Sequence, residues 1–450
     1  MADRTPAEWR AFLERKLHDR WASWQIFDDY YEGDSRIGAW LRTIQTAFQG
    51  TPLGNLLAGL NDNYMTLVVD APAERLRVNG FRFGDKDADK DAERIWQANG
   101  LDGESNMLHT EAIKLGEASW LVQPNGDEPI ITAEHPSQFI VATAPGNRRK
   151  RLAAFKKWVE DDSTLRCNVY LPDRIVKYAA RRDPLAVEKV EWETIAAASN
   201  SLGEVPAVPA PNNPSMLKGG RSDLAYGAIA LQDQILKTVA DSLIGAEYQG
   251  LPQRVLLGVE PPRDPDTGRP IPFEQAAKSR LWYFNNPNAK AHEFSQADLK
   301  NLRETVDGFI GDLAAQTRIP IYYFRPQAIS NISAEALIGL DAGLVSKVND
   351  KKAPFGEAHE EAMRLAFKSI DPNDPRASYT QAETVWADTE SRSQAQVVDA
   401  ATKKQTLGVP FGQIMEDVGY TPEQITRMET ERAADVLLND AAEPAVPPAH

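Results

Sequence analysis

Two long amphipathic helical patterns, separated by a proline-rich insert, constrain this sequence more than any other feature. The first runs from Ser222 to Gln249 and the second from Ser295 to Thr317, with Pro320 just beyond it. At ~1.5 Å per residue the first pattern makes a rod of roughly 40 Å. Ser222 and Asp223 precede the apolar positions, so we expect them to cap the first helix. Two rods around a small insert make a poor enzyme core and are typical of a wall element in an assembly.

The spacing of apolar residues gives each rod one apolar face. Intervals of three, four and seven residues place such positions on one side of a helix. The first face comprises Leu224, Leu231, Ile235, Val239, Leu243 and Ala246, and the second comprises Leu299, Leu302, Val306, Phe309 and Leu313.

Length and composition exclude several classes of protein. A chain of 450 residues that is 42% hydrophobic predicts about three domains with a packed core. Its net charge of -15 argues against static wrapping of nucleic acid, but not against a protein past which DNA slides. Cys167 is the only cysteine, which excludes an intrachain disulfide and a thiolate-rich metal site and fits a reducing compartment. We find no signal peptide and no apolar run long enough for a membrane span.

Helices and strands alternate in blocks along the remaining chain. Thr5-Pro6-Ala7-Glu8 predicts a capped N-terminal helix, and a second helical stretch ends at Gly33. The region from Glu117 to Glu193 is strand-rich, and Pro206–Pro214 is expected to be a stiff extended connection. The insert carries two further short strands, expected at Arg254–Val259 and Leu281–Phe284.

The C-terminal third is predicted to be mostly helical. Ser333 is placed to cap a very long helix, which Pro354 is expected to kink. Further helices are predicted over Ser391–Leu407 and Pro422–Leu438, the second with a capping box that begins at Thr421. The last ten residues are expected to be disordered.

A search for catalytic motifs finds none. The sequence lacks GxxxxGK[ST], GxGxxG, GxSxG and HExxH patterns. We interpret His359 as a surface helix residue, because a zinc site needs at least three convergent ligands. Asp85, Asp87, Asp89 and Asp91 alternate as in a calcium loop, but Lys90 occupies the position of the required glycine, which favours an acidic helix start. We therefore expect no catalytic residue, no cofactor and no metal.

The densest basic run is Arg148-Arg149-Lys150-Arg151. Such a run is usually a solvated hairpin tip or sheet edge. A contact with phosphate or with a partner remains an alternative.

The order of these elements resembles the portal proteins, or head-to-tail connectors, of tailed double-stranded-DNA bacteriophages, in particular the branch common in phages of actinobacteria. The likeness covers nearly the whole chain and depends on loose patterns in a fixed order. These are Tyr30-Tyr31-Glu32-Gly33, Asn63-Tyr64, Val68-Val69-Asp70 with Arg75-Leu76, Asn200 to Pro206, Asn212, Ser222-Asp223-Leu224, Leu231-Gln232-Asp233, Pro252-Gln253-Arg254, Ile319-Pro320 and Ser333 to Leu337.

The resemblance implies an α+β, mostly helical fold with the portal architecture. By position, residues 1–221 correspond to the wing, 222–250 and 295–318 to the two stem helices, and 251–294 to a small α/β clip. Residues 319–332 correspond to the tunnel loop, 333–390 to a kinked wing helix with a return strand, 391–440 to a helical crown, and 441–450 to a disordered tail.

The resemblance also implies partners and a location. Portal subunits form a homo-oligomeric ring, a dodecamer, through which double-stranded DNA passes without sequence-specific contacts. The ring is a docking site for the terminase large subunit and for a head-completion or adaptor protein, and it also meets scaffold and major capsid protein. It is not membrane-bound: it lies at the portal vertex of the virion after assembly in the host cytoplasm.

Candidate site residues follow from these positions. In the tunnel loop they are Arg325, Pro326, Gln327, Ser330 and Asn331. On the stem, Lys237, Lys300 and Arg303 either face the channel or are simply solvated. At the clip, the candidate partner contacts are Arg263, Asp264, Asp266 and Arg269.

Two rival hypotheses remain open. One is another phage head or tail adaptor protein, which would lack the paired stem helices. The other is a hydrolase or metal enzyme with an unfamiliar site.

Overall fold

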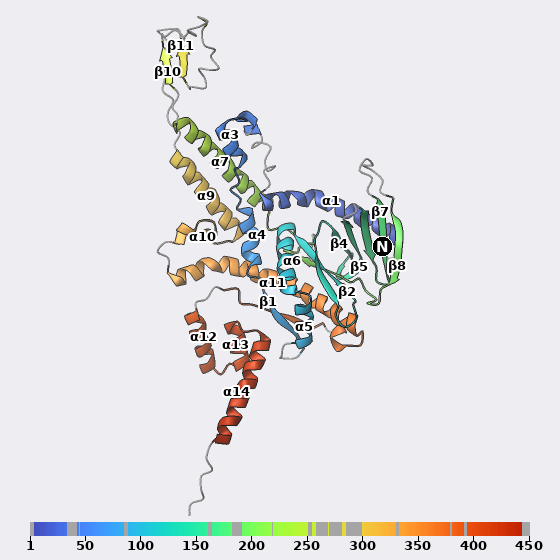
Figure 1. The fold of residues 1–450 in the computed structure, drawn as a ribbon. Helices are drawn as coiled ribbons and strands as arrows, with labels where there is room; N and C mark the ends of the chain where they lie inside the picture. Colours follow the sequence, from blue (N-terminus) through green and yellow to red (C-terminus); the bar gives the residue numbers. More distant parts are fainter. Residues whose placement is uncertain are drawn as a thin grey trace, which may run out of the picture. The chain divides into compact units, whose positions relative to one another are not determined.

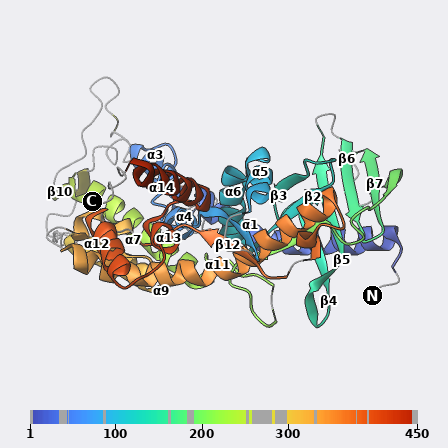
Figure 2. The same ribbon diagram turned by 90° about the horizontal axis from the view of Figure 1, so that it is seen from below.

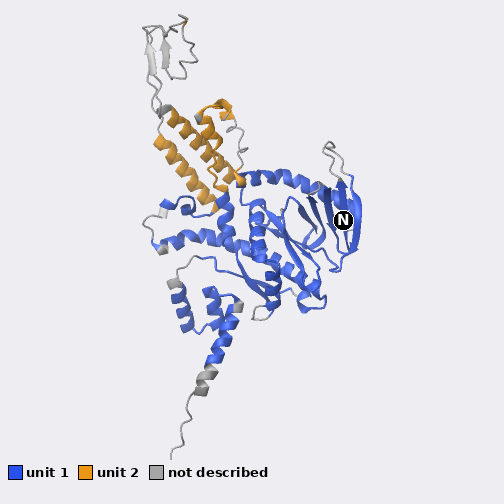
Figure 3. Ribbon diagram, viewed as in Figure 1, with its two compact units in different colours: residues 1–31, 66–225, 318–450 blue, residues 32–65, 226–317 orange. Residues whose placement is uncertain are grey.

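The computed structural model describes residues 4–33, 43–44, 46–84, 89–160, 164–181, 191–217, 219–250, 254–257, 269, 281–284, 299–329, 333–378, 380–390 and 394–442. The chain forms two compact units (Figure 3). Unit 1 comprises residues 1–31, 66–225 and 318–450, and unit 2 comprises residues 32–65 and 226–317. Both helices and sheets are present, so the expected α+β, mainly helical class is observed (Figure 1).

The largest sheet of unit 1 is a five-stranded antiparallel meander in the order β4-β5-β6-β7-β8. The strands are β4 (Phe139–Ala144), β5 (Asn147–Val159), β6 (Thr164–Tyr170), β7 (Arg174–Arg181) and β8 (Glu193–Ser199). Side chains alternate between faces along each strand. Phe155, Val169 and Val176 are in register across neighbouring strands, so they form one apolar row.

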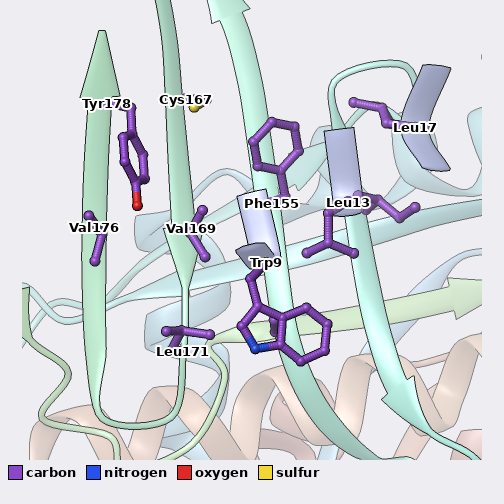
Figure 4. Packing of buried hydrophobic residues seen from close by; sticks show 11 residues of the cluster. Trp9, Leu13, Leu17, Phe155, Cys167, Val169, Leu171, Val176 and Tyr178 are labelled. Carbon is purple, nitrogen blue, oxygen red and sulfur yellow. The ribbon is translucent and has the colours of Figure 1, made fainter. Parts of the chain in front are cut away.

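That row packs against the N-terminal helix α1 (Pro6–Glu32). Trp9, Leu13 and Leu17 recur at a spacing of four residues and lie over the sheet (Figure 4). The capping box is confirmed, since Thr5 Oγ1 accepts from the Glu8 backbone N–H and Glu8 Oε2 accepts from Thr5 N–H. The two expected helical stretches are one continuous helix.

A three-stranded antiparallel sheet, β3-β2-β9, lies beside helices α6 (Leu101–Leu115) and α11 (Ala334–Ile370). Its strands are β2 (Glu117–Gln123), β3 (Ile130–Glu134) and β9 (Ala207–Pro211). The stretch Pro206–Pro214 was expected to be a stiff extended connection. It contains β9, which is an edge strand of this sheet, and edge strands tolerate proline.

A third sheet pairs β1 (Val78–Phe83) with β12 (Ala382–Trp386), which joins residues some 300 positions apart. Helix α4 (Met65–Ala73) leads into β1, and α5 (Lys90–Ala98) follows it. Asp89 caps α5 and accepts from the backbone N–H groups of Asp91 and Ala92. The helix-start interpretation is confirmed for Asp89 and Asp91; Asp85 and Asp87 are outside the described residues.

Helix α11 is the long helix predicted after Ser333. Ser333 Oγ accepts from Ala336 N–H at its start, and the helix continues through Pro354. It is preceded by two short helical turns, α10 (Ile321–Phe324) and η1 (Pro326–Ile329), and followed by η2 (Pro375–Ser378).

The described residues 394–442 form three helices: α12 (Gln394–Thr406), α13 (Phe411–Val418) and α14 (Pro422–Ala442). Two were expected, and α13 was missed. The capping box of α14 is confirmed by reciprocal hydrogen bonds between Thr421 and Gln424.

Unit 2 contains α3 (Pro52–Ala58), α7 (Tyr226–Gly250) and α9 (Leu299–Thr317). Helices α7 and α9 pack side by side, and Leu53 and Leu57 of α3 pack with Ala240 of α7 (Figure 1). Two short strands of the insert, β10 (Arg254–Leu257) and β11 (Leu281–Phe284), pair in parallel. The two predicted strands are thus confirmed.

Candidate functional site

Helices α7 and α9 are the rods predicted from the sequence, with corrected details. Helix α7 begins at Tyr226, so Ser222 and Asp223 do not cap it. The deeply buried positions of α7 include Gln232, Leu236 and Ala240, so its buried face differs in part from the expected one. On α9, the predicted positions Val306 and Leu313 are buried.

Gln232 is a buried polar residue that joins α7 to the segment before α4. Its Oε1 accepts from Tyr64 N–H at 3.0 Å, and its Nε2 donates to Asp62 O at 2.5 Å. Because both ends of the amide are satisfied, its burial costs little.

The three cationic candidates on these helices are exposed, and two have acidic partners on their own helix. Lys237 Nζ lies 2.5 Å from Asp241, and Lys300 Nζ lies 3.7 Å from Glu304. Arg303 is exposed on the same turn region of α9 as Lys300. The charges along this pair of helices are therefore interleaved, and the structure does not form an unbroken basic stripe from these residues.

The segment between α9 and α11 is folded into helical turns. Arg318 adopts a left-handed backbone conformation, with φ of 58°, directly after α9. Ile319 and Phe324 are buried, whereas Pro326 and Gln327 are exposed and Arg325 is half-buried. The expected loop is thus a short α-helical turn and a 3₁₀ turn as far as Ile329; Ser330 and Asn331 are outside the described residues.

An ionic cluster holds this segment on α11. Arg75 Nη2 lies 3.0 Å from Asp341 Oδ2 and donates to Tyr323 Oη at 2.9 Å. Tyr322 Oη donates to the other oxygen of Asp341, and Arg75 Nη1 donates to Thr389 O at 3.2 Å. Four separate segments therefore meet at one guanidinium group.

Arg75 and Tyr322 both keep their protonated forms at neutral pH. Burial disfavours the charged form of Arg75, but its hydrogen bonds with Tyr323 and Asp341 outweigh that effect and raise its pKa. Burial and the neighbouring Asp341 raise the pKa of Tyr322, so its hydroxyl remains a donor. Arg75 belongs to one of the patterns that carry the resemblance to portal proteins. No local pattern in the sequence pointed to Asp341 of α11 as its partner.

A second buried ionic cluster surrounds Asp223. Lys347 Nζ and Lys351 Nζ lie 2.7 and 2.8 Å from its two carboxylate oxygens, and Asn212 Oδ1 accepts from Lys351 at 2.6 Å. Although burial favours the neutral acid, the two ammonium groups outweigh it and lower the pKa of Asp223 to about 2. Burial lowers the pKa of Lys351 to about 8. Asp223 is therefore a structural counter-ion of α11.

His359 is buried, which corrects the expectation of a surface residue. It is 1% exposed, and its Nε2 lies 2.9 Å from His109 Nε2. Trp120 Nε1–H donates to His359 Nδ1, and because an indole can only donate, neutral His359 has its proton on Nε2 and donates it to His109. Burial lowers the pKa of His359 well below its ordinary value and lowers that of His109 to about 3.

The basic run divides into two parts. Arg148, Arg149 and Lys150 are exposed at the tip of the β4–β5 hairpin, as expected. Arg151 is nearly buried and forms ion pairs with Glu204 and Glu361 at 2.8 and 2.6 Å. Of the four clip candidates, only Arg269 is among the described residues, where it is exposed; Arg263, Asp264 and Asp266 are outside them.

Among the residues that the structure describes, no group of three or more His, Cys, Asp or Glu side chains is arranged to hold a metal ion. Within the same ranges, every helix is too short or too polar to span a bilayer.

Helices α7 and α9 flank the insert, and the long helix α11 follows them along the chain, which is the order of elements expected of a portal subunit. Residues 13–435 match the family model described as "Phage portal protein, SPP1 Gp6-like", and the chain belongs to the phage portal protein family. It is 31% identical over 426 residues to the portal protein of Mycobacterium phage D29 and 30% identical over 426 residues to that of Mycobacterium phage L5. Each alignment covers 90% of this chain and 84% of the relative.

Proposed function

We propose that this chain is the subunit of a ring at one capsid vertex, through which the phage genome enters during packaging and leaves during ejection. The observation that carries this proposal is the side-by-side pair of α7 and α9, which flank an insert in a chain that matches the portal family over residues 13–435. In such a ring, each helix pair supplies one segment of the channel wall. The function then comes from many copies of one chain, and the subunit is not an enzyme.

The regions take their roles from their order along the chain. Residues 222–250 and 295–318 form the stem, and 251–294 form the clip that docks the terminase large subunit and later the head-completion protein. Residues 1–221 and 333–390 form the wing, and 391–440 form the crown. The ring is a dodecamer that also meets scaffold and major capsid protein, and it assembles in the host cytoplasm.

The segment at residues 319–332 is the part of the subunit that approaches DNA most closely. The Arg75 cluster supports this role, because it fixes α10 while leaving Pro326 and Gln327 exposed. Rigid placement of a few polar groups suits a conduit: weak, interchangeable phosphate contacts permit sliding, whereas base readout would stop it.

The electrostatics of the stem support the same conclusion. Lys237 and Lys300 each have a carboxylate partner on the next helical turn, so their attraction for phosphate is partly cancelled. The net charge of -15 further weakens static binding of DNA.

Electron microscopy of the full-length chain tests the proposal. The chain should be expressed with the scaffold and major capsid protein of its own phage, because a portal subunit alone can remain monomeric. We expect rings with a central hole and a single ring per capsid. Capsids that form without any such ring, together with a monomeric chain, would rule out the portal role.

A further inference from the structure

Strand β8 forms an open edge of the five-stranded sheet. It pairs with β7 on one side, and no described strand lies beyond it on the other (Figure 1 and Figure 2). All seven residues of Glu193–Ser199 are exposed. Every second residue of an edge strand directs its backbone N–H and C=O away from the sheet. Strand β8 therefore presents a row of backbone groups that can pair with another chain.

The opposite edge of the same sheet is covered within the chain. Phe139 of β4 packs with Leu121 of β2 and Ala207 of β9 in one apolar cluster. By contrast, no described segment shields β8 from solvent. Its sequence also lacks the residues that usually protect an exposed edge, since Glu193–Ser199 contains neither lysine nor proline. An unprotected edge of this length is typical of a strand that another polypeptide covers.

The side chains of β8 leave room for a partner on both faces of the sheet. Ala197 is in register with Val176, so it continues the apolar row that α1 covers, but Ala197 itself is exposed. Ala196 and Ala198 point to the other face. The pairing with β7 is irregular only at Ile195, which forms a bulge. Methyl groups at three successive positions leave space for larger apolar side chains of an added strand.

Two acidic residues lie at the start of β8. Glu191 and Glu193 are both exposed, and neither has an ion-pair partner among the described residues. Trp192 between them is partly buried and packs on the core beneath α1, which fixes the start of the strand. A basic residue of an added strand would find two uncompensated carboxylates here.

We propose that β8 is a docking site for an extended segment of another protein of the particle, which adds to the sheet as a sixth strand; this rests on the proposed function. The segment carries apolar residues opposite Ala196, Ala197 and Ala198 and a basic residue beside Glu191 and Glu193. Main-chain hydrogen bonds supply the affinity, and these side chains supply the specificity.

A different chain is the favoured occupant because of ring symmetry. Pairing of β8 with β8 of a second copy is a two-fold contact, which closes after two subunits and does not continue around a ring. Pairing of β8 with β4 of a second copy is blocked, since β4 is packed against β2 and β9.

Hydrogen exchange tests strand addition directly. The full-length chain is compared as isolated subunits, as rings, and in particles assembled with the scaffold and major capsid protein of its own phage. The outward-facing amides of residues 193–199 should exchange at least about tenfold more slowly in the particles than in the rings. The exposed turn that contains Asp127 and Glu128 is the internal control and should exchange equally in both.

A pair of proline substitutions separates docking from folding. Adjacent residues of a strand direct their N–H groups to opposite sides, so one of Ala197→Pro and Ala198→Pro removes a hydrogen bond to β7 and the other removes only an outward N–H. The first should lower the temperature of unfolding. The second should leave that temperature nearly unchanged but lower the fraction of particles that contain a ring on the order of tenfold.

Charge reversal tests the acidic end of the strand. Glu191→Lys with Glu193→Lys should lower the fraction of particles that contain a ring by roughly threefold to tenfold. The matched control is Asp127→Lys with Glu128→Lys, which makes the same change of charge on the exposed turn between β2 and β3 and should have no effect.

Electron microscopy of the same samples separates the outcomes. Equal exchange of residues 193–199 in rings and particles would overturn the docking proposal and leave the portal function intact, whether or not the proline variants fold. Slower exchange on ring formation alone would also overturn it, because a second copy would then cover β8. Capsids that form without rings from the wild-type chain would overturn the portal function itself.

Discussion

Arg75 and Asp341 form an ion pair of 3.0 Å, although 266 positions separate them in the chain. Tyr323 and Tyr322 of α10 bond to Arg75 and to Asp341 respectively, so the turns that precede α11 are fixed by side chains of distant segments. A four-residue helix has little stability of its own. The position of the candidate channel segment therefore depends on this pair.

Asp341→Asn should destabilise unit 1 by about 3 kcal/mol, because it leaves the mostly buried Arg75 without its counter-charge. Urea unfolding followed by circular dichroism measures the change. Limited proteolysis should also show earlier cleavage within residues 321–329. Glu304→Gln, which removes the exposed partner of Lys300, is the control and should change the free energy of unfolding by less than about 0.5 kcal/mol. Equal stability of the two variants would contradict the anchoring role.

Asp223→Asn should cost about 4 kcal/mol, since two buried lysines would then lack a carboxylate partner. Lys351→Met removes one of the two positive charges and should cost only about 1 kcal/mol, because the pair of Lys347 with Asp223 persists. Chemical unfolding of both variants gives the comparison. A larger loss for Lys351→Met than for Asp223→Asn would refute this account of the cluster.

The His109–His359 pair should make the fold sensitive to acid. Both histidines have pKa values lowered in the folded state, so they are neutral there, whereas the unfolded chain takes up protons below about pH 6.5. Stability should be fully present above that pH and should fall by up to about 1.4 kcal/mol per pH unit for each histidine below it.

Thermal unfolding between pH 8 and pH 5 measures this effect. His109→Gln with His359→Gln should lower stability at pH 8 and flatten the pH dependence. His18→Gln, at an exposed position on α1, should leave the dependence unchanged. An unaltered slope in the double variant would show that other groups cause the acid response.

Deletion of residues 326–331 should leave ring assembly intact but impair packaging or retention of DNA. The deletion removes the exposed Pro326 and Gln327, whereas every residue named in the Arg75 cluster lies outside the deleted segment. DNase-protected DNA per particle is the measurement, with a Gly-Ser replacement of equal length as the control for chain connectivity. Wild-type packaging by the deletion variant would refute the assignment of this segment to the channel.

The local sequence was sufficient to predict features that depend on interactions between residues a few positions apart. The capping boxes at Thr5 and Thr421 and the Ser333 cap form bonds to residues three positions away, so their patterns were readable. Short β-branched and aromatic runs predicted a strand-rich region over Glu117–Glu193, which contains β4, β6 and β7, whereas β5 carries the basic run and β8 begins only at the end of that region.

Local sequence failed where a polar residue finds a distant partner. His359 lies among three glutamates and was expected at the surface, yet Glu360 accepts from Thr384 N–H and Glu361 binds Arg151. At roughly 100° per residue, these neighbours point in different directions, which leaves His359 directed toward His109 and Trp120. Asp223 was likewise expected at a helix start and is instead a buried counter-ion.

The sequence by itself determined the order of elements, the two rods around an insert and the family to which the chain belongs, since these depend on hydrophobic period and capping within a few residues. Only the tertiary structure decided which charges are buried together and which apolar residues remain exposed. The physical reason is that an ion pair such as Arg75 with Asp341 depends on close approach in space, to which separation along the chain gives no guide.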